Sequence, residues 1–276
     1  MSSAVVLSTL ALLASAESPR LVTLGAAVTE TVAALGLESQ IVAVDTTSTW
    51  PPTLAEVPRV GYLRTLPAEG VLGFAPSRVL ATEAAGPPAT MERLKTAGVE
   101  VVFTPEAVTW PEAKARMLKI GKAVGKAESV AELVADNERR LAAVKARFEA
   151  ELRPKVLFLF AHGRAPMVGG RGSVADAMIT LAGGQNALPE VEGHKPPTTE
   201  AVAASQAEVI LTTPRVLAGL GGMEGLSRVP GLGATPALKV GRVVTMDGGL
   251  LLAFGPRTAE AVEQLASALH PKSAKR

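Results

Sequence analysis

The chain lacks cysteine altogether and is short of aromatic residues. Without cysteine there is no disulfide framework, no thiolate metal site and no cysteine nucleophile. The 276 residues include one tyrosine, two tryptophans and six phenylalanines, which leaves few rings for nucleic-acid bases to stack on. The 28 basic residues nearly balance 26 acidic ones, and they form no run that would follow a phosphate backbone. These shortages disfavour a disulfide-stabilised scaffold and a nucleic-acid partner.

Motifs of common enzyme classes are missing as well. The sequence contains no GxSxG, P-loop, HExxH or GxGxxG motif. Two glycine-rich stretches, residues 169–173 and 219–225, lack the dinucleotide-binding spacing, and we interpret both as loops. The three histidines are too scattered along the chain to predict a zinc or manganese cage. The sequence therefore predicts that the protein is not an enzyme.

The first 16 residues have the pattern of a secretion signal. An apolar stretch over residues 4–14 leads into Ala14-Ser15-Ala16, the small-residue pattern after which signal peptidase cleaves. The stretch is too short to span a bilayer, and the alternative is a buried first helix. We predict that residues 1–16 are a signal peptide, and the lack of cysteine removes the attachment point of a lipid anchor. The expected location is therefore the periplasm, as a soluble protein without an anchor.

Short apolar runs alternate with helical patterns in two separate parts of the chain. Each run has the length of a strand, and each helical pattern repeats apolar residues at intervals of three and four. Strands that alternate with helices imply crossover connections and a largely parallel sheet covered on both faces. In the first part we predict strands at 20–25, 40–47 and 78–81, helices at 27–37 and 68–74, and a helix and a strand within 91–105. In the second part we predict a strand at 155–163, a helix at 173–184, a helix and a strand within 198–213, and a last strand within 238–249.

A charged stretch between these parts, residues 111–152, has no strand pattern. Its apolar residues recur at near-helical intervals, and residues 128–152 predict a single amphipathic helix of about 25 residues, roughly 37 Å long. Pro154 ends this helix. We therefore predict an α/β protein of two similar lobes, each with a mostly parallel sheet flanked by helices, joined by one long helix. The expected divisions are an N-terminal lobe over 20–126, a connecting helix over 127–154 and a C-terminal lobe over 155–272.

Two glutamates occupy equivalent places in the predicted lobes. Glu69 lies ten residues before Val79 of one strand, and Glu200 lies nine residues before Val209 of another. Each opens a predicted helix, where the helix dipole favours a carboxylate. Because a single connecting helix allows little hinge motion, we expect a mostly preformed cleft between the lobes, a usual place for a small-molecule site.

Four segments carry a resemblance to a known family. They read RLVTLGAAVTETVAALGL, VPRVGYLRTLPAEGVLGFAPSRVLAT, APMVGGRGSVADAMITLAGGQNA and KPPTTEAVAASQAEVILTT. In these segments the chain resembles the substrate-binding proteins of ABC importers for cobalamin, siderophores and haem, whose two lobes are joined by one long helix. It looks most like the haem-binding branch, and the GYxR segment followed by AEGVL is the part specific to that branch.

The resemblance implies that Tyr62, the single tyrosine, ligates a haem iron at the mouth of the cleft. A phenolate is a hard anionic oxygen ligand that suits Fe(III), and tyrosine is a known axial haem ligand. Because the phenol must ionise, a nearby cation favours ligation. Arg64 is expected to supply that charge or to pair with a haem propionate, and the resemblance suggests Arg215 of the second lobe for a similar role. The alternative is that Tyr62 packs a loop and Arg64 and Arg215 are solvated.

Further positions receive roles from the same resemblance. His162, at the end of a predicted strand, is a candidate second iron ligand or the ligand of a second haem, and alternatively hydrogen-bonds its own loop. Met167, Gly169 and Gly170 are candidates to line an apolar face of the haem pocket, because glycine allows close backbone approach. The alternative for these three is a flexible loop with one buried methionine.

The two glutamates and the remaining histidines complete the set. By the resemblance, Glu69 and Glu200 dock on arginines of the permease dimer, one from each lobe, and charge-assisted pairing suits exposed carboxylates. Alternatively each is only a helix-start residue. We expect His194 and His270 at the surface.

The implied function is capture of haem, Fe(III) protoporphyrin IX, and its delivery to an ABC permease dimer with its ATPase. A ferric siderophore or cobalamin is the alternative ligand. Cobalamin brings its own lower axial base and needs no phenolate. A siderophore saturates its iron and prefers a basic, aromatic-lined pocket, which Trp50, Trp110 and Arg64 leave open.

Overall fold

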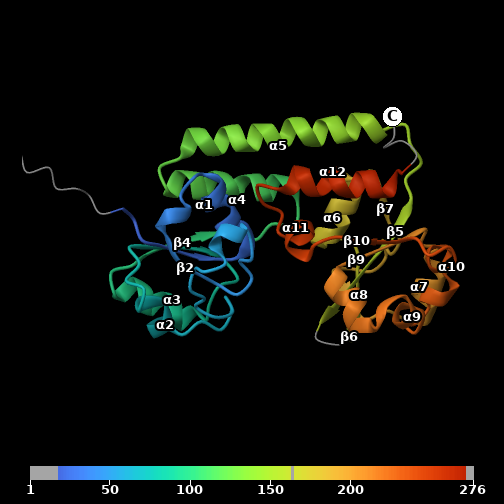
Figure 1. Ribbon diagram of the computed structural model, residues 1–276, viewed down its shortest axis with the longest axis horizontal. Helices are drawn as coiled ribbons and strands as arrows, with labels where there is room; N and C mark the ends of the chain where they lie inside the picture. Colours follow the sequence, from blue (N-terminus) through green and yellow to red (C-terminus); the bar gives the residue numbers. More distant parts are fainter. Residues whose placement is uncertain (1–17, 163–164, 272–276) are drawn as a thin grey trace, which may run out of the picture.

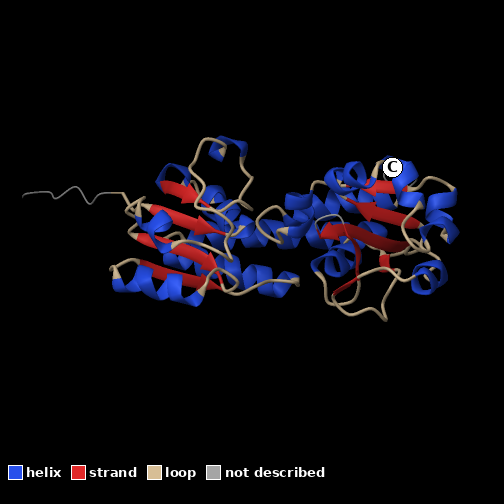
Figure 2. Cartoon of the chain, turned by 90° about the horizontal axis from the view of Figure 1, so that it is seen from below, coloured by secondary structure: helices blue, strands red, loops and turns tan. Residues whose placement is uncertain are grey.

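The computed structural model describes residues 18–162 and 165–271, so the predicted signal peptide lies outside the described residues. The described chain forms two separate sheets flanked by helices (Figure 1). Figure 2 shows the two groups of strands standing apart, with helices around each group and between them. The predicted fold class, α/β with two lobes, is therefore confirmed.

The first sheet is entirely parallel, with strand order β2-β1-β3-β4. Residues that alternate along its strands point to opposite faces, so each face has its own apolar cluster. Helix α1 packs on one face, and α2 and α3 pack on the other. These elements are β1 (Leu21–Leu24), α1 (Ala26–Ala34), β2 (Ile41–Val44), α2 (Ala68–Leu72), β3 (Arg78–Thr82), α3 (Pro88–Thr96) and β4 (Glu100–Thr104).

Two helices follow the first sheet. Helix α4 (Trp110–Ala123) begins with a capping box, in which Thr109 caps the helix and Glu112 accepts the Thr109 backbone N–H at 2.9 Å. Helix α5 (Ala127–Phe148) has 22 residues, about 33 Å at the usual rise. The predicted helix at 128–152 therefore ends four residues early, because the chain turns after Phe148.

Helix α5 is buried in two different cores along its length. Val130 and Val134 pack in the cluster that covers the first sheet, whereas Leu141, Val144 and Phe148 pack in the cluster that covers the second. Figure 1 shows α5 running over both halves of the molecule, above α4 on one side and α12 (Thr258–Leu269) on the other. One helix thus joins the two halves through apolar burial at both of its ends.

The second sheet is mixed rather than mostly parallel. Strands β5, β9 and β10 are parallel, with β7 also parallel to β5, but β5 and β6 form an antiparallel hairpin to which β8 adds antiparallel. The hairpin was not predicted, because its second strand contains a proline and a glycine that give no strand signal. The strands are β5 (Lys155–His162), β6 (Ala165–Gly169), β7 (Gln185–Asn186), β8 (His194–Lys195), β9 (Val209–Thr212) and β10 (Val243–Thr245).

The prediction that the glycine-rich stretch 219–225 forms a loop is wrong. These residues form the end of one helix and most of the next. Thr213 caps the first of these helices, and Gly221 turns the chain between them with a φ of 92°, which favours glycine. Helices of this half are α6 (Val174–Leu181), α7 (Thr199–Ala204), α8 (Pro214–Leu220), α9 (Gly222–Ser227), α10 (Pro236–Lys239) and α11 (Gly248–Leu252).

The expectation that His270 lies at the surface is also wrong. Its side chain is buried at the end of α12 and stacks on Phe148, with ring centroids 4.6 Å apart. This contact closes the far end of α5 against α12. His194 is exposed, as expected, and its ring meets the edge of Phe160 at 4.7 Å between centroids.

Side chains of α4 and α5 bind residues 253–259, which lead into α12 and form its first turn. Arg116 of α4 donates to the carbonyls of Ala253 and Phe254 at 2.9 and 2.6 Å. Asn137 of α5 donates to the Pro256 carbonyl at 2.9 Å. Hydrogen bonds therefore tie the two halves together in addition to apolar contacts.

Within residues 18–162 and 165–271, no helix combines the length and the apolar character needed to cross a bilayer.

Candidate functional site

The carboxyl ends of the strands of the first sheet meet at one edge, where the following loops line a cavity of about 300 Å³. Parallel sheets commonly place ligands at this edge. The lining includes Gly25 after β1, Thr82 at the end of β3 and Glu106 after β4. Val174 of α6 and Leu252 of α11 line the same cavity from the second half. The cavity therefore lies in a cleft between the halves.

Tyr62 stands on the wall of this cavity, in the loop that follows β2. The loop is held on both sides, because Val60 donates to the Val44 carbonyl at 2.9 Å and Thr46 donates to the Gly61 carbonyl at 3.0 Å. Gly61 has a φ of 104°, so glycine is needed where the chain turns to present the tyrosine. The side chain is 46% exposed, and its hydroxyl has no hydrogen-bond partner among the described residues. The phenol is thus presented to the cleft rather than packed in a core.

Arg64 lines the same cavity two residues further on. It is exposed, and its guanidinium makes no hydrogen bond or ion pair within the described part of the chain. The structure therefore brings the predicted phenol and its predicted cation together on one wall.

A second, larger cavity of about 720 Å³ adjoins the first at Leu252, which lines both. Phe160 and Ala161 of β5 and Arg215 of α8 are in its lining. Arg215 is exposed in the first turn of α8. The predicted arginines thus lie on separate walls, Arg64 in the first cavity and Arg215 in the second.

The predicted pocket residues on and just after β6 are not among the described residues that line the two cavities. Met167 is half-buried and pairs in register with Phe160, which lines the larger cavity. Gly169 and Gly170 are buried, and neither belongs to the described lining of the two cavities. A Cβ on Gly169 would stand 2.8 Å from the Phe158 ring, so close packing accounts for this glycine.

The predicted second iron ligand, His162, is the last residue of β5 and pairs with Ala165 across the hairpin. Its side chain lies outside the described residues. Its backbone is at the same end of β5 as Phe160 and Ala161, two residues that line the larger cavity.

The two glutamates are exposed at the starts of short helices, Glu69 in α2 and Glu200 in α7. Glu69 pairs with Arg93 of α3. A hydrogen bond from its own backbone N–H and the Arg93 charge lower the pKa of the Glu69 carboxyl. The two carboxylates are therefore charged surface groups, one on each half.

Arg116 was not predicted and forms part of the wall of the smaller cavity. It is only 3% exposed, and burial lowers the pKa of its guanidinium, against the opposing charges of Glu106 and Glu112. Its spacing gives a signal in the sequence, since Ala113, Met117 and Ile120 are buried at −3, +1 and +4 from it. A charge at a core position of a helix is a candidate functional residue.

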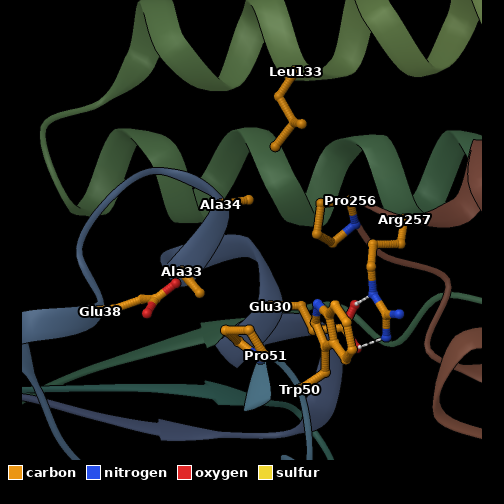
Figure 3. Close-up of a pocket in the computed structure, with 9 residues that line it drawn as sticks. All are labelled: Glu30, Ala33, Ala34, Glu38, Trp50, Pro51, Leu133, Pro256 and Arg257. Atoms are coloured by element: carbon orange, nitrogen blue, oxygen red, sulfur yellow. Dashed lines mark hydrogen bonds and ion pairs between the residues drawn. The ribbon is translucent and has the colours of Figure 1, made fainter. Parts of the chain in front are cut away.

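A third pocket, of about 250 Å³, lies outside the cleft (Figure 3). It is lined by residues of α1, of α5 and of the chain at the start of α12. Its polar groups are paired: Arg257 donates to both carboxylate oxygens of Glu30, at 2.8 and 3.1 Å, and lies 4.2 Å from the ring centroid of Trp50. Burial raises the pKa of the Glu30 carboxyl, although its bonds to Arg257 oppose this. We interpret the contacts among Glu30, Arg257 and Trp50 as a joint between the two halves, and we do not assign the pocket as a ligand site.

No group of three or more histidine or acidic side chains within residues 18–162 and 165–271 is arranged to hold a metal ion. The cleft instead offers one phenol, several arginines and apolar walls. Such a set suits a ligand that carries its own metal and anionic groups.

Residues 21–250 match the family described as periplasmic binding protein. The solved structure of the periplasmic haem-binding protein RhuT from Roseiflexus sp. RS-1 is similar, with a TM-score of 0.88 and 34% identity over 93% of this chain and 99% of that one. The periplasmic haem-binding protein BhuT, solved in complex with two haems, has a TM-score of 0.84 and 37% identity over 91% of this chain and 99% of its own.

Curated relatives are more distant in sequence. An ABC transporter substrate-binding lipoprotein of Bacillus subtilis, YvrC, is 27% identical over 94% of this chain and 82% of its own length. The vitamin B12-binding protein of Vibrio cholerae is 25% identical over 91% of this chain and 88% of its own length.

Proposed function

The chain belongs to the periplasmic binding protein family, and we propose that it captures haem in the cleft between its halves, with Tyr62 as the iron ligand, for delivery to an ABC permease. The observation that carries this proposal is the exposed phenol of Tyr62, which stands in the cleft without a hydrogen-bond partner among the described residues. A tyrosine held for packing is normally buried and bonded through its hydroxyl. The proposal is supported by the haem-binding proteins RhuT and BhuT, to which the chain is similar over more than nine-tenths of its length.

The dimensions and charges of the cleft suit haem. Its two adjoining cavities, of about 300 and 720 Å³, fall in the range of small-molecule sites. Haem presents an apolar macrocycle with two carboxylates at one edge. Leu252 and Phe160 offer apolar walls, and Arg64 and Arg215 offer cations on separate walls. In this proposal Arg64 favours the ionised phenol of Tyr62 or pairs with a propionate, and Arg215 acts from the other side.

The second half contributes the other proposed contacts. His162 is proposed as a second iron ligand because its backbone stands at the cavity end of β5. Met167, on the neighbouring strand, is proposed to support the apolar wall beside Phe160. Gly169 and Gly170 allow close packing against Phe158 and Val191, respectively.

Delivery is proposed to proceed through the exposed glutamates, Glu69 on one half and Glu200 on the other. Each offers a carboxylate to an arginine of the permease, and Glu69 would exchange Arg93 for that partner. We propose that the ATPase-driven permease is the acceptor and that the protein acts in the periplasm, as the family description implies.

The test is a titration of the purified protein with hemin, followed by visible absorption. Wild type is expected to bind saturably with the spectrum of a high-spin ferric phenolate. Tyr62→Phe removes only the hydroxyl and is expected to abolish that spectrum and weaken binding at least about tenfold, or about 1.4 kcal/mol. Trp50→Phe, a change at a similarly exposed aromatic residue that does not line the two cavities of the cleft, is the matched control and is expected to bind as wild type. An unchanged spectrum in Tyr62→Phe would reject Tyr62 as the ligand.

Cobalamin is the second candidate ligand, because the vitamin B12-binding protein of Vibrio cholerae is a relative. A parallel titration with cyanocobalamin separates the two. Saturable binding of cobalamin without binding of hemin would reject the haem proposal. Binding of a ferric siderophore alone would reject both.

A further inference from the structure

Arg116 is a buried cation without a counterion. It lies in the middle of α4 and is 3% exposed. One terminal nitrogen, Nη2, donates to the carbonyls of Ala253 and Phe254, but Nε is buried and bonds to no acceptor in the described part of the chain. No carboxylate of the described residues lies within ion-pair distance of its guanidinium. A full positive charge is thus balanced only by the partial charges of two carbonyl oxygens.

Three carboxylates oppose the effect of burial on the Arg116 pKa through their negative charge: Glu106, Glu112 and Glu30. Glu112 accepts from the N–H groups of Val108 and Thr109 at 2.9 Å in the capping box. Glu30 is occupied by Arg257. Glu106 is exposed on the rim of the cavity, where it accepts the Ala84 N–H at 3.3 Å. Each carboxylate therefore has another partner.

An unpaired buried charge is costly, because no opposite charge compensates for its loss of solvation. A structural role explains part of the arrangement, since a cation at the carboxyl end of α11 interacts favourably with that helix. It leaves Nε without an acceptor, in a residue that also lines the smaller cavity. An anion that enters this cavity would bring a negative charge close to the guanidinium.

We propose that Arg116 is a carboxylate-binding residue of the cleft, which takes one carboxylate of the transported ligand deep in the smaller cavity. This rests on the proposed function, and for haem the carboxylate is a propionate. The proposal requires only that the carboxylate enter the cavity that Arg116 lines, where two opposite charges attract more strongly than in bulk water. Arg64 and Arg215 then serve the open side of the cleft, and the ligand is oriented by its buried acid group as well as by its metal.

The experiment compares the dissociation constants of hemin and of hemin dimethyl ester, in which both carboxylates are blocked. Wild type is expected to bind the acid roughly ten- to a hundredfold more tightly than the ester, the range of a charge-assisted hydrogen bond. Arg116→Gln is expected to reduce that preference to about threefold or less. Arg139→Gln, which removes an exposed arginine on α5, is the matched control and is expected to keep the wild-type preference.

The ratio of acid to ester separates recognition from folding. A purely structural Arg116 would weaken both ligands equally in Arg116→Gln and leave their ratio unchanged, which would overturn the proposal. Equal binding of acid and ester by wild type would also overturn it while leaving haem capture intact. Failure of wild type to bind either ligand would overturn the proposed function as well.

Glu106→Gln keeps the test decisive if Arg116→Gln does not fold. Glu106 lines the same cavity and repels an entering carboxylate. Its neutralisation is expected to raise the preference for the acid severalfold, because it removes the repulsion between two carboxylates. An unchanged preference in this variant would count against a carboxylate in the smaller cavity.

Discussion

The joint between the halves makes a stability prediction whose size depends on pH. Arg257 donates twice to Glu30, which is 3% exposed, whereas the Arg257 side chain is 18% exposed and lies over Trp50 (Figure 3). The two charged residues are 227 positions apart and belong to opposite halves. Arg257→Gln removes the cation and leaves a carboxylate buried without a charged partner.

The cost of this change at pH 7 is limited by protonation of Glu30. Its usual pKa is 4.5, and forcing such a group to be neutral at pH 7 costs about 3.4 kcal/mol, from 1.36 kcal/mol for each of 2.5 pH units. At pH 5 the same limit is about 0.7 kcal/mol. Loss of the cation–ring contact with Trp50 adds about 0.5–1 kcal/mol at both pH values. Because burial raises the Glu30 pKa in wild type as well, wild type already carries part of this cost. We expect a destabilisation of up to about 4 kcal/mol at pH 7 that falls to at most about 2 kcal/mol at pH 5.

The sign follows from proton linkage. In the variant, Glu30 of the folded protein has a pKa above that of the unfolded chain. Folding therefore takes up a proton near neutral pH, and the variant gains stability relative to wild type as the pH falls. In wild type Arg257 opposes the effect of burial on the Glu30 pKa. The difference in the free energy of unfolding between wild type and Arg257→Gln therefore becomes smaller at low pH.

Urea unfolding at pH 7 and pH 5, followed by tryptophan fluorescence, measures this difference. The m-value must stay constant for the free energies of unfolding to be compared. Arg139→Gln, which breaks an exposed pair on α5, is expected to change the free energy of unfolding by less than about 0.5 kcal/mol at either pH. An Arg257→Gln cost that is the same at both pH values would refute the assignment of a buried, unpaired Glu30 in the variant.

Three further variants in the second half test close packing at two glycines and the burial of a histidine. Gly170→Ala places a Cβ into the backbone carbonyl of Val191 and is expected to destabilise the fold by about 3 kcal/mol. Gly219→Ala, a position in α8 with no atom within 4 Å of the added carbon, is expected instead to stabilise it by about 0.5–1 kcal/mol; thermal unfolding of both variants checks this, and equal melting temperatures would contradict it. Burial lowers the pKa of His270, so stability is present above its usual pKa of 6.5 and is lost as the pH falls below it. His270→Phe should lose less stability than wild type between pH 7 and 5 in urea unfolding, by up to about 1.4 kcal/mol per pH unit, and parallel slopes would argue against this role.

The alternation of strands and helices was readable from the sequence because each pattern follows directly from backbone geometry. Three of the predicted strands appear as β1, β3 and β9, each of four or five mostly apolar residues. The β5–β6 hairpin was missed because its second strand is held by pairing with β5 rather than by its own residues. Helix α5 ended before Leu152 because nothing covers that residue, which is 92% exposed.

The candidate site was only partly predictable. A local motif pointed to Tyr62 and Arg64, and the structure places both on one cavity wall, although their roles remain predictions. Arg116 was overlooked because its partners, Ala253 and Phe254, lie 137 and 138 residues away. No local pattern encodes such a contact. Its helical spacing among buried apolar residues was nonetheless present in the sequence and marks it as a charge in a core position.

The position of Arg116 connects the smaller cavity to the contact between the two halves. The residue lines the smaller cavity, and its guanidinium donates to the carbonyls of Ala253 and Phe254, three to four residues before Arg257. Asn137 binds the same stretch on both sides, donating to Pro256 and accepting from the Ala259 N–H at 2.9 Å. Moving the halves apart must therefore break several buried polar contacts together, each costing about 1–3 kcal/mol if left unsatisfied. Thermal motion rarely supplies that sum, so wide spontaneous separation of the two halves is disfavoured.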